Sequence, residues 1–249
     1  MRWALPMICL LVSLAACGGS GIPTSAPPPA TATASARVVA RQVNIPADGG
    51  ATLIGHVYGS GRTAVVLSNM GDNDPALWDG FAPLLAARGY TVLTYSYRYA
   101  PRSSGFTAAM ANDTVADLRG AIAFITQAGA SRLVLIGASL GGIATAKVAG
   151  AAGAAAIVLM ASLLDLVEYD FRVTDQELAA LTAPKLVVAS EADATVPFAA
   201  TREVYDRAPQ PKQFTSYPGS EHGVRLFTSS YGDALRQCII DFVTSTAPA

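Results

Sequence analysis

Apolar residues gather in short continuous runs along this chain, and longer segments with apolar residues at helical spacing separate these runs. Such runs are typical of strands buried on both faces of a parallel sheet. They occupy residues 63–69, 91–95, 133–136, 155–160 and 185–190. Segment 112–128 presents Val115, Leu118, Ile122 and Ile125 on one side, which predicts an amphipathic helix. The alternation predicts an α/β fold with a mostly parallel central sheet, right-handed crossovers and helices on both faces.

The remaining pattern adds an N-terminal hairpin and further helices. Two β-prone runs flank Ala47-Asp48-Gly49-Gly50 at residues 37–45 and 52–58, which predicts an antiparallel hairpin. Helices are expected at residues 76–88, 143–150, 199–207 and 225–244, and a weaker last strand at 213–217. Gly89 would end the first of these helices.

The connection between the strands at 155–160 and 185–190 is short. About 24 residues separate them, which leaves room for one or two helices over residues 163–181. We therefore expect no large lid domain over the carboxyl ends of the strands, and a fairly open site.

The first residues have the character of a targeting segment. Arg2 precedes an apolar stretch at residues 5–15, which is too short to span a bilayer as a helix. The stretch ends in Leu14-Ala15-Ala16-Cys17, an order that resembles the lipobox of bacterial lipoproteins. This resemblance implies a signal peptide at residues 1–16, lipid on Cys17 and a protein anchored to the bacterial cell envelope outside the cytoplasm. An ordinary secretory signal is the alternative.

Residues 17–36 follow as a Pro-, Ala-, Thr- and Ser-rich segment with almost no large apolar side chain. Such a segment cannot form a core and is expected to be a flexible tether to a domain at 37–249. After removal of Cys9 and lipidation of Cys17, Cys238 would remain without a disulfide partner. It shares a helical stripe with Leu235 and Ile239, so we expect it to be a buried apolar residue.

Length and composition restrict the function classes. The chain has 249 residues, 51% of them hydrophobic and 14% charged, which fits one α/β domain plus short extras. With a formal net charge of −1 and no basic run, nucleic acid is not an expected partner. No Cys/His cluster has metal-ligand spacing, so we expect neither a metal nor another cofactor.

The candidate chemistry begins at Gly137-Ala138-Ser139-Leu140-Gly141, a G-x-S-x-G sequence. It follows the apolar run 133–136 and precedes the expected helix at 143–150. A Ser in a tight turn between strand and helix is the context of a nucleophile elbow, where glycines on both sides relieve crowding. We therefore predict Ser139 as a nucleophile at the carboxyl edge of the sheet.

A serine nucleophile needs a base and an acid that orients the base. His222 follows the last expected strand, whereas His56 lies within the hairpin and is interpreted as structural. Asp193 follows the strand at 185–190, one strand before His222, and is the predicted acid. The alternatives for the acid are Glu191, Asp165 and Asp170.

These pieces together resemble the α/β-hydrolase superfamily, in its compact esterase and dienelactone-hydrolase-like part. The sequences GASLG, EADATVP and SEHG each follow an expected strand, and the resemblance covers about residues 37–246. The order Ser139, Asp193, His222 is the order of the superfamily. The resemblance implies the nucleophile, acid and base roles for these three residues.

The expected oxyanion hole departs from the family pattern. Relatives often have His-Gly after the first parallel strand, whereas this chain has Ser68-Asn69-Met70-Gly71. Because the donor is a backbone N–H, the hole can survive the change. Leu140 is the first expected donor, and Met70 or Gly71 is the second.

The expected activity is cleavage of carboxylic esters with small or medium acyl groups through an acyl-enzyme. A peptidase, thioesterase or acyltransferase would use the same triad, and a catalytically silent binding protein of the same fold is the alternative from another class. The expected pocket residues are Met70, Tyr97, Tyr99, Phe106, Leu140, Leu163, Val196 and Phe198.

Overall fold

The computed structural model describes residues 39–99 and 105–249. The predicted signal peptide, Cys17 and the tether lie outside these residues, so their assignment stays a prediction. Within the described ranges, no helix is long and apolar enough to cross a membrane, and no three His, Cys, Asp or Glu residues are grouped to bind a metal ion.

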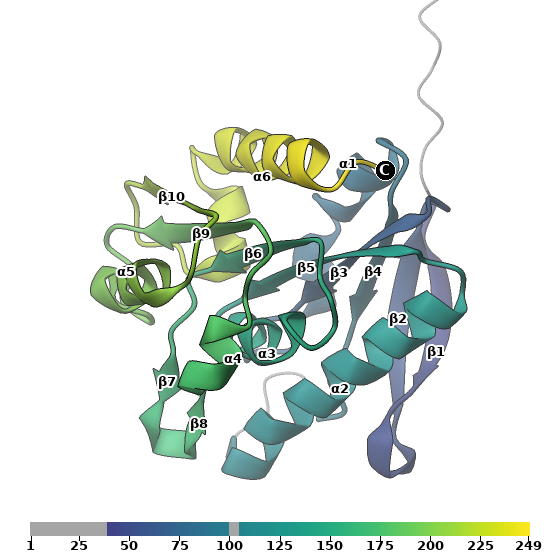
Figure 1. Ribbon diagram of the computed structural model, residues 1–249, viewed down its shortest axis with the longest axis horizontal. Coiled ribbons are helices and arrows are strands. Elements are labelled where there is room, and N and C mark those ends of the chain that lie inside the picture. The colour runs from purple at the N-terminus through teal and green to yellow at the C-terminus, as the bar shows by residue number, and fades with distance from the viewer. Residues whose placement is uncertain (1–38, 100–104) are drawn as a thin grey trace, which may run out of the picture. The chain divides into compact units, whose positions relative to one another are not determined.

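The described chain is organised around an eight-stranded sheet with the order β1-β2-β4-β3-β5-β6-β9-β10 (Figure 1). β1 pairs antiparallel with β2 and β2 pairs antiparallel with β4, while all other pairs are parallel. The strands are β1 Arg41–Pro46, β2 Thr52–Tyr58, β3 Thr63–Ser68, β4 Thr91–Tyr95, β5 Arg132–Ala138, β6 Ala156–Met160, β9 Lys185–Ser190 and β10 Lys212–Tyr217. The predicted hairpin and parallel sheet are confirmed.

Helices cover both faces of the sheet, which explains why its central strands are continuously apolar. Alternate residues of β3 enter different cores: Val66 packs with α2 and α3, and Val65 and Leu67 pack with α1 and α6. In Figure 1, α1 and α6 lie on one face of the sheet and α2 to α5 on the other. The helices are α1 Ala82–Ala86, α2 Ala108–Gln127, α3 Leu140–Ala149, α4 Asp175–Ala179, α5 Phe198–Arg207 and α6 Gly232–Thr246.

Two predicted helices are broken in the structure. Segment 76–88 forms the 3-10 helix Pro75–Trp78 and the short α1, and segment 225–244 forms the 3-10 helix Gly223–Thr228 and α6. At the second break, a Cβ on Gly232 would lie 2.1 Å from the carbonyl oxygen of Phe227. The close backbone turn at this glycine ends one helix and starts the next, which helical periodicity alone does not indicate.

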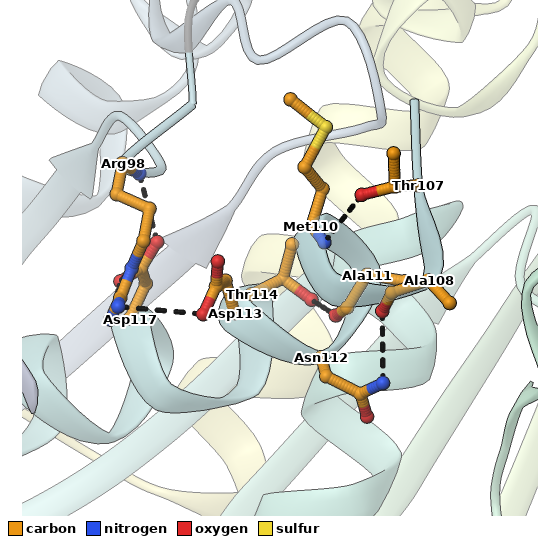
Figure 2. Close-up of polar contacts among 9 residues, drawn as sticks. All are labelled: Arg98, Thr107, Ala108, Met110, Ala111, Asn112, Asp113, Thr114 and Asp117. Carbon is orange, nitrogen blue, oxygen red and sulfur yellow. Dashed lines mark hydrogen bonds and ion pairs between the residues drawn. The ribbon is translucent and has the colours of Figure 1, made fainter. Parts of the chain in front are cut away.

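Helix α2 begins one turn earlier than predicted, because Thr107 caps it. The Thr107 hydroxyl accepts a hydrogen bond from the N–H of Met110 at 3.2 Å (Figure 2). Asn112, the predicted start, lies inside the helix and donates through its side chain to the carbonyl of Ala108 at 2.9 Å.

The predicted burial of Cys238 on α6 is only partly confirmed, because the residue is half-buried.

The connection between β6 and β9 contains a small hairpin where one or two helices were expected. Strands β7 Asp165–Leu166 and β8 Phe171–Arg172 pair antiparallel around the 3-10 helix Val167–Tyr169, and α4 is the α-helix of this connection. A capping box of Thr174 and Glu177 starts α4. The connection therefore holds a compact hairpin and one short helix rather than a large lid domain, as predicted.

Candidate active site

Ser139 occupies a strained turn between β5 and α3. Its backbone has φ 52° and ψ −119°, a conformation that L-residues rarely adopt outside functional turns. A Cβ on Gly137 would lie 2.2 Å from the carbonyl oxygen of Gly141, and one on Gly141 would lie 2.3 Å from that of Asn69. Only glycines fit beside this turn, so the G-x-S-x-G pattern has a steric cause.

Asp193 and His222 form a hydrogen-bonded pair after β9 and β10. The Asp193 Oδ2 atom lies 2.8 Å from His222 Nδ1, and Asp193 Oδ1 accepts from the N–H groups of Thr195 and Val196 at 2.8 and 3.0 Å. The Asp193 side chain is 1% exposed. Because an ionised carboxylate only accepts hydrogen bonds, it holds the proton of His222 on Nδ1 and leaves Nε2 as the proton acceptor.

The loop of His222 packs against the Ser139 turn. A Cβ on Gly223 would lie 2.6 Å from Met70 Sδ and 3.4 Å from the Cβ of Ala138, the residue before Ser139. Gly223 has φ 54°, so both its conformation and its surroundings favour glycine. This contact places the His222 loop beside the end of β5.

The alternative acids do not contact His222. Glu191 Oε1 accepts from the Ser216 hydroxyl at 2.9 Å, and Asp170 pairs with Arg172 on the β7–β8 hairpin at 2.6 Å. Asp165 is exposed on the same hairpin. His56 lies on β2, paired with Gln42 of β1 and Thr94 of β4, so the structure places it in the sheet as expected.

The loop after β3, residues 69–73, is fixed to the end of β4 and the residues after it by buried and partly buried hydrogen bonds. The Asn69 side chain donates to the carbonyl of Tyr95 at 2.6 Å, and the Asn69 carbonyl accepts from the Tyr97 hydroxyl at 2.8 Å and from the N–H of Gly141 at 3.0 Å. The Tyr99 hydroxyl donates to the Gly71 carbonyl at 3.3 Å. The Asn69 side chain therefore holds this loop against the end of β4.

Asn73 is a second buried amide in this network. Its Oδ1 accepts from the N–H of Tyr97 at 2.7 Å, and its Nδ2 donates to the carbonyls of Tyr97 and Tyr99 at 3.2 and 2.7 Å. Sequence reasoning missed Asn73 and gave Tyr97 only a possible pocket role. The alternation of tyrosines at 95, 97 and 99 is the signal that could have pointed to this network.

Arg98 fastens the same tyrosine segment to α2. Its Nε and Nη2 atoms lie 2.8 and 2.7 Å from Asp117 Oδ1, and its backbone N–H donates to Asp117 Oδ2 at 2.9 Å. Its Nη1 atom also lies 3.4 Å from Asp113 Oδ1 (Figure 2). Burial raises the pKa of Asp117, against the lowering effect of Arg98. The ion pair fixes the loop after β4 to the long helix.

A cavity of about 250 Å³ opens next to Ser139, and its lining is mainly apolar. It is bordered by Gly71, Tyr99, Phe106, Ser139, Leu140, Ile143, Leu163, Leu166, Tyr169, Thr195 and Val196. Of the expected pocket residues, Met70 and Tyr97 are buried in the core instead, and Phe198 packs edge-on against Phe214. Leu166 and Tyr169 were missed because they belong to the unpredicted β7–β8 hairpin.

Two of the three candidate oxyanion donors border this cavity. Gly71 and Leu140 border it, whereas Met70 does not. Within residues 39–99 and 105–249, the N–H groups of Met70, Gly71 and Leu140 donate to no protein acceptor. Helix α3 begins at Leu140, so its positive dipole end also points to the Ser139 turn.

Known proteins resemble this chain in sequence or in fold, as follows. No protein-family model matches the chain. By sequence it is similar to the uncharacterised protein YfhR of Escherichia coli K12, with 24% identity over 220 residues that cover 80% of this chain and 72% of that protein. YfhR therefore gives no assigned activity to transfer.

Solved structures are similar in fold. An α/β serine hydrolase without a lid from Xanthomonas campestris has 17% identity and a TM-score of 0.65, covering 84% of this chain and 96% of that one. A Pyrococcus furiosus esterase has 14% identity and a TM-score of 0.69 over 84% and 91%. Thermogutta terrifontis esterase 2, phosphorylated by paraoxon, has 20% identity and a TM-score of 0.69 over 84% and 95%. The chain thus has the α/β-hydrolase fold, as predicted.

Proposed function

We propose that this protein is a serine hydrolase that cleaves carboxylic esters with small or medium acyl groups. The observation that carries the proposal is the Asp193–His222 hydrogen bond of 2.8 Å, on a loop packed against the strained Ser139 turn. Structural neighbours that are esterases add support by fold.

In this mechanism the Ser139 hydroxyl attacks the ester carbonyl while His222 Nε2 takes its proton. The resulting oxyanion is stabilised by the N–H groups of Leu140 and Gly71 and by the dipole of α3. His222 then returns the proton to the departing alcohol, which leaves an acyl group on Ser139. Water, deprotonated by His222, hydrolyses this acyl-enzyme and restores the serine.

The cavity supports an uncharged, apolar acyl group. The side chains that line it among the described residues are aliphatic, aromatic or hydroxyl-bearing, and none is charged. A charged acyl tail would lose its hydration there without gaining a partner, which is costly. The length of the acyl group, within the small and medium range, should therefore set the rate of ester hydrolysis. A carboxylate at the end of the acyl group should abolish turnover.

The direct test is covalent labelling of the purified protein with a fluorophosphonate probe, together with turnover of a panel of p-nitrophenyl esters, thioesters and peptides. We expect labelling at Ser139 and fastest turnover of the esters. Ser139→Ala should lose the label, and Ser131→Ala, which changes an exposed serine before β5, should keep it. A folded wild-type protein that is neither labelled nor active would favour a silent binding protein.

We also propose that the protein is held at the bacterial cell envelope by lipid on Cys17. The support is the sequence alone, because Leu14-Ala15-Ala16-Cys17 resembles a lipobox. The wild-type protein should partition into detergent and Cys17→Ser should not. Recovery of wild-type protein in the aqueous phase with an unmodified N-terminus near residue 17 would contradict the anchor and leave the hydrolase proposal intact.

A further inference from the structure

An ion pair joins the loop after β3 to the loop of His222. Arg225 Nη2 lies 2.5 Å from Asp72 Oδ2, across 153 positions of sequence. Asp72 follows Gly71 directly, and the N–H of Arg225 donates to the carbonyl of His222 at 3.1 Å. The pair therefore connects the candidate oxyanion donor with the candidate base.

Arg225 also contacts the residue on the other side of Gly71. Its Nη1 atom lies 3.9 Å from Met70 Sδ, and the same sulfur packs against Gly223, next to His222. One guanidinium group thus touches both residues that flank Gly71. This arrangement limits the movement of the Gly71 N–H relative to the His222 loop.

Arg225 is the cation that pairs with the Asp72 carboxylate. The Asp72 side chain is 18% exposed, and its Oδ1 atom is buried without a hydrogen-bond partner in the described part of the chain. The effect of this carboxylate extends to the cavity wall: burial raises the pKa of Tyr99, and Asp72 raises it further. A carboxylate in this position needs a compensating cation, and Arg225 supplies one.

We propose that Arg225 is a positioning residue, which neutralises Asp72 beside the oxyanion site and holds the Gly71 loop against the His222 loop. This inference rests on the proposed ester hydrolysis, in which negative charge develops next to Gly71. Without Arg225, the bare Asp72 charge would oppose that developing charge. The cost would fall on the transition state more than on binding of the neutral ester.

The test measures kcat and KM of the full chain with a p-nitrophenyl ester for four variants. Arg225→Gln should lower kcat about thirtyfold with little change in KM, because a bare carboxylate beside the oxyanion site opposes the charge of the transition state but not the neutral ester. Arg225→Lys should stay within about threefold of wild type, because it keeps the charge. Asp72→Asn and the double variant Asp72→Asn/Arg225→Gln should both lie within about fivefold of wild type, because each loses the contact that holds the loop but neither leaves a bare carboxylate.

The matched control is Arg202→Gln, which removes an arginine of similar exposure from the surface pair with Asp206 and should leave kcat unchanged. Amide hydrogen exchange supplies a readout that needs no turnover: residues 69–74 should exchange faster in Arg225→Gln than in Arg202→Gln. A double variant as slow as Arg225→Gln would overturn the charge argument. Wild-type kcat and wild-type exchange in Arg225→Gln would overturn the whole inference, whereas an inactive wild-type protein would overturn the proposed function instead.

Discussion

The candidate site has two sides, and they are held in place by different means. On the oxyanion side, residues 69–73 and 95–99 are connected by hydrogen bonds, most of them buried, from the side chains of Asn69, Asn73, Tyr97 and Tyr99 to backbone atoms. On the acid–base side, the functional side chains bind each other, since Asp193 contacts His222 directly. The surrounding loops are joined to each other by the N–H groups of Glu191 and Ala192, which donate to the carbonyls of Tyr217 and Gly219, and by the Ser190 hydroxyl, which donates to the carbonyl of Glu221.

This difference follows from what each side contributes. A backbone N–H has no side-chain rotamers of its own, so its position is fixed only if the whole loop is fixed by its neighbours. An imidazole can instead be oriented by one hydrogen bond to a buried carboxylate. We therefore expect changes on the acid–base side to act on rate, and changes on the oxyanion side to act on both rate and stability.

The largest effect is expected from Ser139→Ala and His222→Ala. Each should lower kcat for ester hydrolysis by about five decades or more, and the double variant should be little worse than either, because the nucleophile and its base act as one unit. Steady-state kinetics and thermal unfolding should show the rate loss without loss of the fold. Full activity in Ser139→Ala would remove the basis of the serine hydrolase proposal.

A smaller loss is expected from Asp193→Asn. An amide can hold the imidazole in the wrong tautomer and cannot stabilise its positive charge, so kcat should fall by about three to four decades. Glu191→Gln is the matched control, because Glu191 contacts Ser216 rather than His222. A dead Glu191→Gln enzyme beside an active Asp193→Asn enzyme would show that the acid is wrongly assigned.

Asn73→Ala tests the oxyanion side. It leaves a buried N–H and two carbonyls without partners, which should lower the free energy of unfolding by about 2–4 kcal/mol. Displacement of the Gly71 loop should also reduce kcat by about tenfold to a hundredfold. Urea unfolding and kinetics would measure both effects. Asn112→Ala, which removes an exposed amide from α2, should change neither, and a wild-type rate in a destabilised Asn73→Ala would separate this network from the chemistry.

Lys185 lies at the amino-terminal edge of the sheet, away from the candidate site, and we expect it to affect stability rather than rate. It is fully buried at the start of β9, and its ammonium donates to the carbonyls of Pro209 and Pro211 at 2.7 and 2.9 Å. Burial lowers the pKa of Lys185 from 10.5 to about 8. Between pH 8 and 10.5 the unfolded chain binds more protons at Lys185 than the folded chain does. The contribution of Lys185 to the free energy of unfolding therefore rises with pH in this range. It is complete above pH 10.5 and is lost as pH falls through 8.

Lys185→Met should remove this pH dependence while leaving kcat at neutral pH unchanged. The difference in unfolding free energy between wild type and variant should move by about 3 kcal/mol in favour of wild type from pH 7 to above 10. Urea unfolding at several pH values measures this difference, in which the titration of all other groups cancels. A difference that does not vary with pH would contradict the shifted pKa.

Local sequence determined much of this protein. Strands such as β9 Lys185–Ser190 are continuously apolar because both of their faces are covered, so their positions follow from the residues alone. The glycines around Ser139 mark a turn that no other residue fits. Parallel strands end at one edge, and for this reason the positions of Ser139, Asp193 and His222, each directly after an expected strand, predicted that they share this edge.

Only the tertiary structure decided how those loops are held and what lines the cavity. The bonds of Asn69 and Asn73 to the tyrosine segment, and the pair of Arg225 with Asp72, join residues whose partners are chosen by packing rather than by spacing. The hairpin β7–β8 likewise depends on long-range contacts, since Phe171 is buried in the core beside α3. Periodicity reports burial along one segment, but the partner of a polar side chain is set by which segments the fold brings together, and that information is distributed over the whole chain.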